Sequence, residues 1–375
     1  MSDSNPARYI MIGGFLGAGK STSIARLAEH LDAQGLRVGL ITNDQGNRLV
    51  DTLNLASRGF QVEEIPGGCF CCRFHSLLEA AENLSAETRP DVFIAEPVGS
   101  CTDLIASVSY PLRRIYGDRF RIAPLSVVVD PRRARRVLGL SAEPGFSQKV
   151  TYIYLKQLEE ASIIVINKND LIGIAERESL AAALRDRFPR ARIMDASART
   201  GEGLPEWFAA VTETEQDGGE AMELDYQIYA EGEALLGWLN ATVRLSATSL
   251  VDGDRFLSEL ARAVQDNLAE RGVEIAHFKM TLEPNDGSGE LAVLSLVGTE
   301  FEPEFTQTLS DPLSDGELIV NLRAEGEPAW LEDSLRAGLA ACSDSFGRLE
   351  LEHLESFKPG EPKPVYRMAS ADAVV

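Results

Sequence analysis

The segment "GGFLGAGKST", residues 13–22, is the feature that most constrains the fold of this chain. It contains the pattern G-x-x-x-x-G-K-[ST] at Gly14, Gly19, Lys20 and Ser21. The apolar run "RYIMI" precedes it, and the helical pattern "STSIARLAEHLDAQG" overlaps its end and continues beyond it. A strand, a glycine-rich turn and a helix in this order predict a phosphate-binding loop, because glycines let backbone N–H groups point inward at phosphate oxygens. An accidental glycine-rich turn is the alternative, and this context disfavours it.

Each side chain of the loop has an expected task. We expect Lys20 to reach the β- and γ-phosphates and the Ser21 hydroxyl to bind Mg²⁺. Thr22 is placed to contact the α-phosphate, and Gly17 and Ala18 complete the loop. The sequence therefore predicts a site for a nucleoside triphosphate or diphosphate with Mg²⁺.

Short apolar runs alternate with helical patterns through the first 215 residues. They are "RVGLITND", "DVFIAE", "APLSVVVD", "ASIIVINK" and "ARIMDAS". Such runs are typical of strands covered on both faces, as in a parallel sheet wrapped by helices. We predict an α/β fold over residues 1–215, a P-loop NTPase domain with a mostly parallel sheet.

The rest of the chain follows a different order of elements. A chain of 375 residues is about twice the usual size of one domain. Residues 216–225 lie in an acidic stretch without periodicity and are predicted to be a linker. The patterns over 226–365 predict a smaller α+β domain of β-α-β-β-α-β type with an extra strand. We expect residues 366–375 to form a flexible tail.

The tetrapeptide "NKND" directly follows the apolar run "IIVI" and bears on the choice of base. It contains Asn167, Lys168 and Asp170, and it resembles the N-K-x-D element of GTPases. A carboxylate here accepts hydrogen bonds from both N1–H and the exocyclic amine of guanine, whereas adenine presents an acceptor at N1. Ser197 and Ala198 resemble the segment whose backbone contacts guanine O6. The combination favours GTP over ATP.

Three cysteines are crowded into the segment "GGCFCC". Three thiolates from Cys69, Cys71 and Cys72 suit a transition metal such as Zn²⁺, with Co, Ni or Cu as further candidates. Three ligands leave a fourth position open for exchange, which suits transfer better than storage. His75 is a conceivable fourth ligand or the start of a solvated helix. Redox chemistry, or a role as small buried residues, is the alternative for the three cysteines.

Composition narrows the partners and the compartment. The chain has 58 acidic and 36 basic residues and a net charge of −22, so nucleic acids and acidic membranes would be repelled. No apolar stretch approaches the roughly 18 residues that a membrane span requires. The five cysteines do not form a disulfide framework, and Cys101 and Cys342 stand alone in sequence and are expected to be structural. We expect a cytoplasmic protein.

In combination, these motifs resemble one known family. The phosphate loop, "GGCFCC", "EPVG" and "NKND" look like the CobW-type GTPases of the SIMIBI class, whose relatives include UreG, HypB and MeaB. The resemblance covers roughly residues 8–215. It implies GTP-dependent association, such as homodimer formation, and delivery of a metal to a client protein or assembly of that client. Residues 226–365 have the approximate plan of the C-terminal domain of this family.

The resemblance also implies roles for four further residues. Asp44 matches an acidic residue that helps to hold Mg²⁺, and Glu64 matches a glutamate near Mg²⁺ or its waters. Glu96 matches the Walker B acid, and Gly99 the glycine expected to sense the γ-phosphate. Carboxylates beside Mg²⁺ orient the attacking water in phosphoryl transfer. We therefore expect Lys20, Asp44 and Glu96 to be catalytic.

The chain departs from the family pattern at several positions, including these two. Asn47 stands where the family has a glutamate that can be a metal ligand, and Pro97 stands where a hydroxyl residue is common. Because no arginine finger or catalytic glutamine is evident, GTP hydrolysis by the chain alone should be slow.

These observations favour a GTP-hydrolysing metallochaperone that delivers a transition metal, Zn or Co, or a metallocofactor to a client metalloprotein. One alternative keeps the GTPase but makes it a chaperone for assembly or reactivation of a corrinoid-dependent enzyme, with structural or redox cysteines. A P-loop small-molecule kinase is a more remote alternative.

Overall fold

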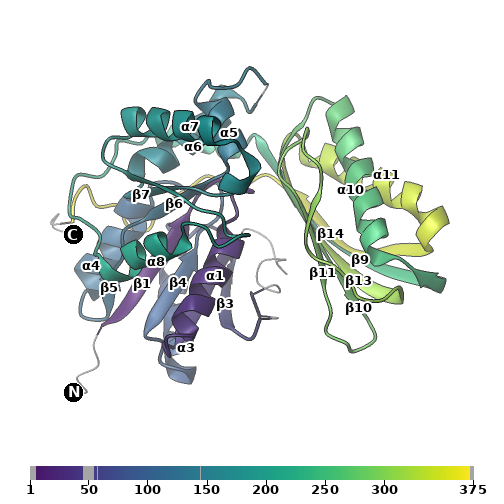
Figure 1. The fold of residues 1–375 in the computed structure, drawn as a ribbon, viewed down its shortest axis with the longest axis horizontal. Coiled ribbons are helices and arrows are strands. Elements are labelled where there is room, and N and C mark those ends of the chain that lie inside the picture. Colours follow the sequence, from purple (N-terminus) through teal and green to yellow (C-terminus); the bar gives the residue numbers. More distant parts are fainter. Residues whose placement is uncertain (1–5, 45–54, 57, 144, 372–375) are drawn as a thin grey trace. The chain divides into compact units, whose positions relative to one another are not determined.

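The computed structural model describes residues 6–44, 55–56, 58–143 and 145–371, except for the side chain of Asp44. The chain divides into two compact units (Figure 1). The first comprises Met1–Gln45, Arg58–Gly232 and Glu361–Val375, and the second comprises Gly46–Ser57 and Glu233–Gly360.

The first unit is an α/β structure. Its strands are β1 (Ala7–Gly13), β2 (Val38–Asp44), β3 (Gln61–Pro66), β4 (Val92–Glu96), β5 (Phe120–Ile122), β6 (Ser126–Val129), β7 (Ile163–Ile166) and β8 (Arg192–Asp195). Its helices are α1 (Lys20–Asp32), α3 (Phe74–Glu87), α4 (Tyr110–Tyr116), α5 (Pro131–Val137), α6 (Gln148–Glu160), α7 (Ile174–Arg187) and α8 (Leu204–Glu213). A π-helical turn over Ile105–Ser109 precedes α4, and α9 (Tyr226–Glu233) runs to the boundary of the second unit.

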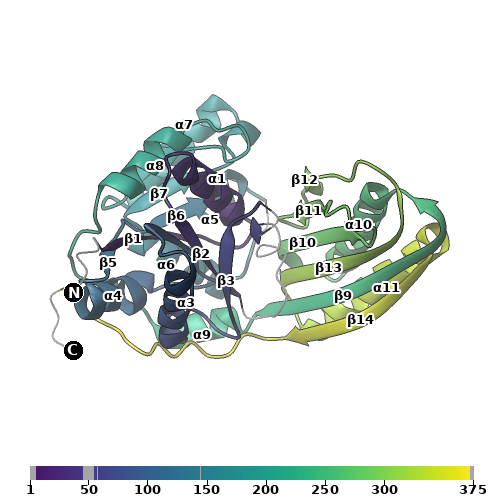
Figure 2. The ribbon, with the colours of Figure 1, turned by 90° about the horizontal axis from the view of Figure 1, so that it is seen from below.

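The sheet of this unit has the strand order β3-β2-β4-β1-β6-β7-β8, and β5 pairs with the first half of β1. Every described pair in it is parallel. Strands β4, β6 and β7 consist wholly of buried residues, which explains their continuous apolar runs. Figure 2 shows α1 and α8 on one face of the sheet and α3 and α4 on the other.

The second unit is an antiparallel sheet with two long helices. Its strands are β9 (Leu236–Val251), β10 (Glu274–Pro284), β11 (Ala292–Leu296), β12 (Glu304–Gln307), β13 (Leu313–Glu325) and β14 (Arg348–Phe357). The strand order is β12-β11-β10-β13-β9-β14, and α10 (Gly253–Glu270) and α11 (Pro328–Phe346) cover one face. The predicted fold class, a parallel P-loop domain with a smaller α+β domain, is confirmed.

The two helices of the second unit pack closely at one glycine. A Cβ added to Gly338 of α11 would lie 3.0 Å from Leu260 Cδ1 and 3.0 Å from Val264 Cγ2, both on α10. Leu260 is fully buried in the core between the helices and the sheet.

Among the described helices of the whole chain, none has the length and apolarity needed to cross a membrane.

We predict that Leu260→Ala lowers the free energy of unfolding by about 2–5 kcal/mol, because it removes buried methyl groups and leaves a cavity at the α10–α11 contact. Denaturant unfolding of the full chain measures the change. Leu250→Ala is the matched control, since Leu250 is 69% exposed and should change stability by less than about 0.5 kcal/mol. Equal effects of the two substitutions would contradict the assigned core.

Candidate nucleotide and metal site

The predicted phosphate loop lies at the carboxyl end of β1, between the strand and α1. Strand β1 pairs with β4 on one side and with β6 on the other. Residues that follow β4, β6, β7 and β8 therefore meet at the same edge of the sheet as the loop. In parallel α/β sheets, ligands bind at this edge, where successive connections diverge to opposite sides of a strand.

Two glycines of the loop are required because other parts of the chain lie against them. A Cβ on Gly14, whose φ is +130°, would lie 2.2 Å from the carbonyl oxygen of Val128 in β6. A Cβ on Gly19, with φ +91°, would lie 2.4 Å from Asn167 Nδ2. Both positions therefore need glycine for conformation and for space. The result is a cradle of backbone at the start of α1.

Lys20, Ser21 and Glu96 meet at this cradle. Ser21 Oγ donates to Glu96 Oε1 at 3.1 Å, and Lys20 Nζ lies 3.9 Å from the same oxygen. All three side chains are buried. A hydroxyl beside a carboxylate is the hard oxygen set that Mg²⁺ accepts, so these residues fit the ion.

Glu64 belongs to the same row of the sheet. Thr42 in β2 is the register partner of both Glu64 in β3 and Glu96 in β4. Paired residues of neighbouring strands point to one face, so Glu64 shares the face of Glu96 two strands away. The Asp44 side chain and Asn47 lie outside the described residues. Thr22 is half-buried in the first turn of α1.

The "NKND" segment is joined directly to the phosphate loop. Asn167 Nδ2 donates to the carbonyl of Ala18 at 2.9 Å, and Lys168 Nζ donates to the carbonyl of Gly17 at 2.9 Å. Asn167 Oδ1 accepts from the Ala198 N–H at 3.0 Å. The structure thus brings together the three segments that the sequence analysis assigned to phosphate and base.

Asp170 is held at the rim of this arrangement. Ser197 Oγ donates to Asp170 Oδ1 at 2.6 Å, and the Arg199 guanidinium lies 3.8 Å from Asp170 Oδ2. The carboxylate is thus fixed in orientation beside Ala198.

Asp130 is a site residue that the sequence analysis missed. Its buried carboxylate accepts from Lys168 Nζ at 2.9 Å and caps α5 by accepting from the Arg132 and Arg133 N–H groups. Burial opposes its charged form, but Lys168 and Arg133 outweigh burial and hold the pKa of Asp130 below its usual value. The signal was present: an acidic residue at the end of the buried run "SVVV", followed by the helix-starting Pro131.

The three predicted metal-binding cysteines converge. Their Sγ atoms are 2.8 Å apart for Cys69 and Cys71, 3.2 Å for Cys69 and Cys72, and 3.6 Å for Cys71 and Cys72. Among the described residues, they form a group that could hold a metal ion. Gly67 and Gly68, both with positive φ, form the turn that leads into them.

The thiols around Cys69 differ in pKa. Cys101, which the sequence analysis expected to be structural, is buried in the connection that follows β4. The hydrogen bonds from Cys101, Cys71 and Cys72 lower the pKa of Cys69, while the interaction with Cys69 raises the pKa of Cys71 and brings that of Cys72 to about 11. The cluster therefore favours one thiolate, on Cys69, and binding a metal through further sulfurs releases protons.

The last described segment of the chain, 361–371, packs over the cysteine motif. The Lys363 N–H donates to Cys72 Sγ at 3.1 Å, and the Val365 N–H donates to the carbonyl of Cys71 at 2.9 Å. The Tyr366 ring packs edge-on against Phe74, the first residue of α3, with the ring centroids 5.2 Å apart. Figure 2 shows this segment, in yellow, running past α3. The donation from Lys363 lowers the pKa of Cys72, but the interaction with Cys69 outweighs it and raises the pKa to about 11.

The segment between Gly99 and Ile105 connects the phosphate loop with the segment 361–371, which contacts the cysteine motif. A Cβ on Gly99 would lie 2.8 Å from Leu16 Cδ2 and 3.0 Å from Leu16 N in the phosphate loop. Two residues later, Cys101 is buried. Asp103 has a positive φ of 66° and is paired with Arg367 of the segment 361–371 at 2.8 Å.

Glu160, at the end of α6, holds the segment between Gly99 and Ile105 in place through hydrogen bonds. It accepts from Thr102 Oγ1 at 3.0 Å and from the Ile105 N–H at 3.1 Å. Burial, and then the nearby charge of Asp103, raise the pKa of Glu160 to about 8. Near neutral pH the anchor is therefore a carboxylic acid that becomes charged as the pH rises.

These observations agree with comparisons to known proteins. The family model described as "CobW/HypB/UreG, nucleotide-binding domain" matches residues 8–195, just over half of the chain. The chain therefore belongs to this family, and the family predicted from the motifs is confirmed.

Among its relatives is the zinc chaperone YeiR of Escherichia coli (strain K12), 31% identical over 166 residues, which are 44% of this chain and 47% of YeiR. Another is the zinc chaperone CobW of Sinorhizobium sp, 29% identical over 214 residues, which are 51% of this chain and 59% of that protein. The chain thus spans about half the length of these curated relatives. The crystal structure of Zn(II)-bound YjiA GTPase from E. coli matches with 16% identity and a TM-score of 0.36, covering 90% of this chain and 99% of that chain.

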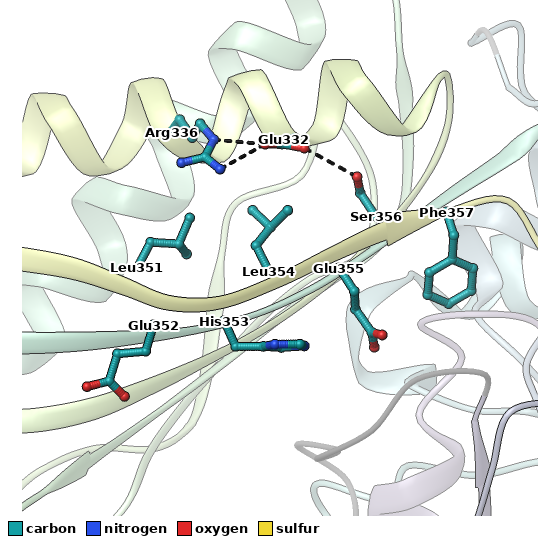
Figure 3. Close-up of a pocket in the computed structure, with 9 residues that line it drawn as sticks. All are labelled: Glu332, Arg336, Leu351, Glu352, His353, Leu354, Glu355, Ser356 and Phe357. Carbon is teal, nitrogen blue, oxygen red and sulfur yellow. Dashed lines mark hydrogen bonds and ion pairs between the residues drawn. The ribbon is translucent and has the colours of Figure 1, made fainter.

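The second unit carries a shallow groove between α11 and β14 (Figure 3). Glu332 pairs with Arg336 along α11 at 2.9 Å and accepts from Ser356 Oγ on β14 at 3.4 Å. Glu352 and His353 point away from this pair. Since its polar side chains do not converge on one point, we assign no function to the groove.

We predict that Gly19→Ala lowers the affinity for GTP and GDP by at least about tenfold, roughly 1.4 kcal/mol, because its Cβ displaces Asn167 from the loop. Equilibrium titration with a fluorescent guanine nucleotide measures it. The matched control is Gly35→Ala, since Gly35 also has a positive φ but nothing within 4 Å of its Cβ position. A similar loss of affinity in both variants would contradict the role of the contact with Asn167.

We predict that Glu160→Gln flattens the pH dependence of stability between about pH 5 and 8. The folded chain binds the Glu160 proton more tightly than the unfolded chain, so this contribution is complete below the ordinary pKa of 4.5 and is lost as the pH rises through about 8. Urea unfolding at a series of pH values measures the slope. Glu213→Gln, at an exposed glutamate, is the control and should keep the wild-type slope.

Proposed function

We propose that this protein is a GTP-hydrolysing metallochaperone that couples its nucleotide state to the delivery of a transition metal, zinc in the first place, to a client metalloprotein. One observation carries the proposal. A cluster of three cysteine thiols has its sulfur atoms 2.8–3.6 Å apart and lies in the same unit as a phosphate loop. The segment 361–371, which donates to Cys72 Sγ, is paired with Asp103, four residues after the Gly99 that packs on the loop.

The nucleotide in this proposal is GTP. The fixed carboxylate of Asp170 would accept from guanine N1–H and the exocyclic amine, and the Ala198 region would face O6. Asn167 and Lys168 would position the two loops through their hydrogen bonds to Ala18 and Gly17. The charge of Lys168, already balanced by Asp130, would act in positioning rather than in the reaction.

The phosphate and Mg²⁺ roles follow the same geometry. Lys20 would bind the β- and γ-phosphates, Ser21 would be a direct ligand of Mg²⁺, and Glu96 would hold the ion or its waters. We also propose Glu64 and Asp44 near the ion, and Gly99 as the residue that responds to the γ-phosphate. Mg²⁺ would neutralise charge that develops on the phosphates.

Zinc is favoured as the cargo on two grounds. Thiolates suit a soft or borderline ion, which includes Zn²⁺ and Co²⁺. The relatives YeiR and CobW are named zinc chaperones. Their names point to zinc rather than to a corrinoid enzyme, so the corrinoid alternative is not favoured, and cobalt remains a secondary candidate for the same thiols.

Delivery requires that the site hold the metal in one state and release it in another. GTP hydrolysis would change the contact between Gly99 and Leu16 and thereby the position of Asp103, which is paired with Arg367 of the segment that contacts Cys72. The client would then take the metal through ligand exchange at the thiols. A client metalloprotein and a GTP-dependent homodimer are the proposed partners, in the cytoplasm.

The test is a zinc titration of the full chain with GTP, GDP or no nucleotide, with a competing chelator of known affinity. We predict one Zn²⁺ per chain and an affinity that differs by at least about tenfold between nucleotide states, equal to about 1.4 kcal/mol. The variant with Cys69, Cys71 and Cys72 all changed to Ser should lose this binding while retaining GTP binding. Zinc affinity unchanged by nucleotide and by the triple substitution would refute the proposal.

A further inference from the structure

We propose that the segment 361–371 is a releasable strap over the cysteine motif, and that the ion pair between Arg367 and Asp103 is its latch. This inference rests on the proposed metal-binding function. It adds a step to that function: the latched strap keeps the ligands of another protein away from the thiols, and its release opens the motif for exchange of the metal.

The first half of the strap lies on the motif through two backbone amides. The Lys363 N–H donates to Cys72 Sγ at 3.1 Å, and the Val365 N–H donates to the carbonyl of Cys71 at 2.9 Å. Residues two apart in an extended chain have the same orientation, so both amides are directed at the motif. The strap therefore contacts the cysteine segment much as a neighbouring strand would.

Prolines alternate with these two donors. Pro362 and Pro364 lack an N–H, and their fixed φ keeps the backbone extended. Pro362 is buried, whereas Lys363 and Val365 are exposed. This half of the strap is thus shaped for the contact, but it has little buried apolar surface to oppose its release.

The strap contacts the cysteine that is most open to exchange. Cys69 is 5% exposed and Cys71 is 2% exposed, while Cys72 is half-buried. Exchange of a metal between two proteins begins at the sulfur that an incoming ligand reaches first. Since the Lys363 amide occupies the Cys72 sulfur, the strap limits the rate of that first step.

The second half of the strap is fixed more firmly. The Met368 N–H donates to the carbonyl of Ala106 at 2.9 Å, and the Met368 side chain is buried. The Ala221 N–H donates to the carbonyl of Ala369 at 2.8 Å. This half therefore stays attached when the first half leaves the motif.

Arg367 lies between the two halves and forms the latch. Its Nε donates to Asp103 Oδ2 at 2.8 Å, and its Nη2 donates to Asp103 Oδ1 at 3.3 Å. Tyr226 Oη donates to the same Oδ2 at 2.6 Å. The Asp103 side chain is only 1% exposed, so removal of the guanidinium leaves a buried carboxylate without this partner, which is unfavourable.

His75, the conceivable fourth ligand from the sequence, belongs to the surface on which the strap lies. It is exposed, and its ring packs edge-on against Tyr366 with the centroids 6.0 Å apart. Among the described residues, the group of close metal donors does not include His75. Its aromatic contact accounts for it as a support of the strap.

The latch is connected to the nucleotide site through Gly99, four residues before Asp103. Gly99 packs so closely on Leu16 that a Cβ would overlap the phosphate loop. Just beyond Asp103, the Ile105 N–H is held by Glu160 at 3.1 Å. A shift of Gly99 when the γ-phosphate is lost is therefore carried along a short segment to Asp103, and it strains or relaxes the pair with Arg367.

The rate at which N-ethylmaleimide labels Cys72 in the reduced, metal-free full chain measures opening of the strap. We expect Arg367→Gln to be labelled at least about tenfold faster than wild type, because labelling follows the population of the open state. Arg121→Gln is the matched control, since it removes an exposed ion pair with Glu215 in the same unit and should keep the wild-type rate. An unchanged rate in Arg367→Gln would overturn the latch.

Hydrogen exchange of the wild-type strap, measured by mass spectrometry, needs no variant to fold. We expect the amides of 361–371 to exchange at least about tenfold faster in one of two states, GDP or a non-hydrolysable GTP analogue. Equal exchange in both states would overturn the control of the strap by nucleotide. Both measurements use metal-free chain, so absence of zinc binding would refute the metallochaperone function and not the opening of the strap.

Discussion

Close packing around the phosphate loop is the constraint on which the rest of the site depends. Gly14 lies against the Val128 carbonyl, Gly19 against the Asn167 amide, and Leu16 against Gly99. Each contact leaves no room for a Cβ on the glycine. Residues at the ends of β6, β7 and β4 together position the loop. A change in the ligand that the loop binds therefore shifts the residues at all three strand ends.

This packing links the nucleotide site and the cysteine cluster, which lie in the same unit. The segment from Glu96 to Asp103 contacts Ser21 at one end, carries Gly99 and Cys101 in the middle, and is paired with Arg367 at the other. Its anchors on α6 are hydrogen bonds to buried groups rather than apolar contacts alone. Hydrogen bonds of this kind have a defined geometry, so the segment is suited to two discrete positions instead of gradual deformation.

The motif arguments succeeded where local sequence and chemistry are closely tied. The strand–loop–helix around Lys20, the convergence of "NKND" with Ala198, and the alternation of elements in both units follow from patterns within short windows. Strands β3, β5 and β12 were not predicted. Strand β5 is only three residues long, and β3 and β12 contain charged residues and few buried ones, so they lack the apolar run that marks a buried strand.

The sequence by itself determined the phosphate loop, the guanine-type motif, the cysteine triplet and the family, because each is written in contiguous residues with fixed backbone requirements. Only the tertiary structure decided which residues from distant parts of the chain contact them. It placed Asp130 against Lys168, Arg367 against Asp103, and the amide of Lys363 on Cys72. These contacts join positions about 40 to 290 residues apart, and they arise from sheet order and helix packing, which no local pattern encodes.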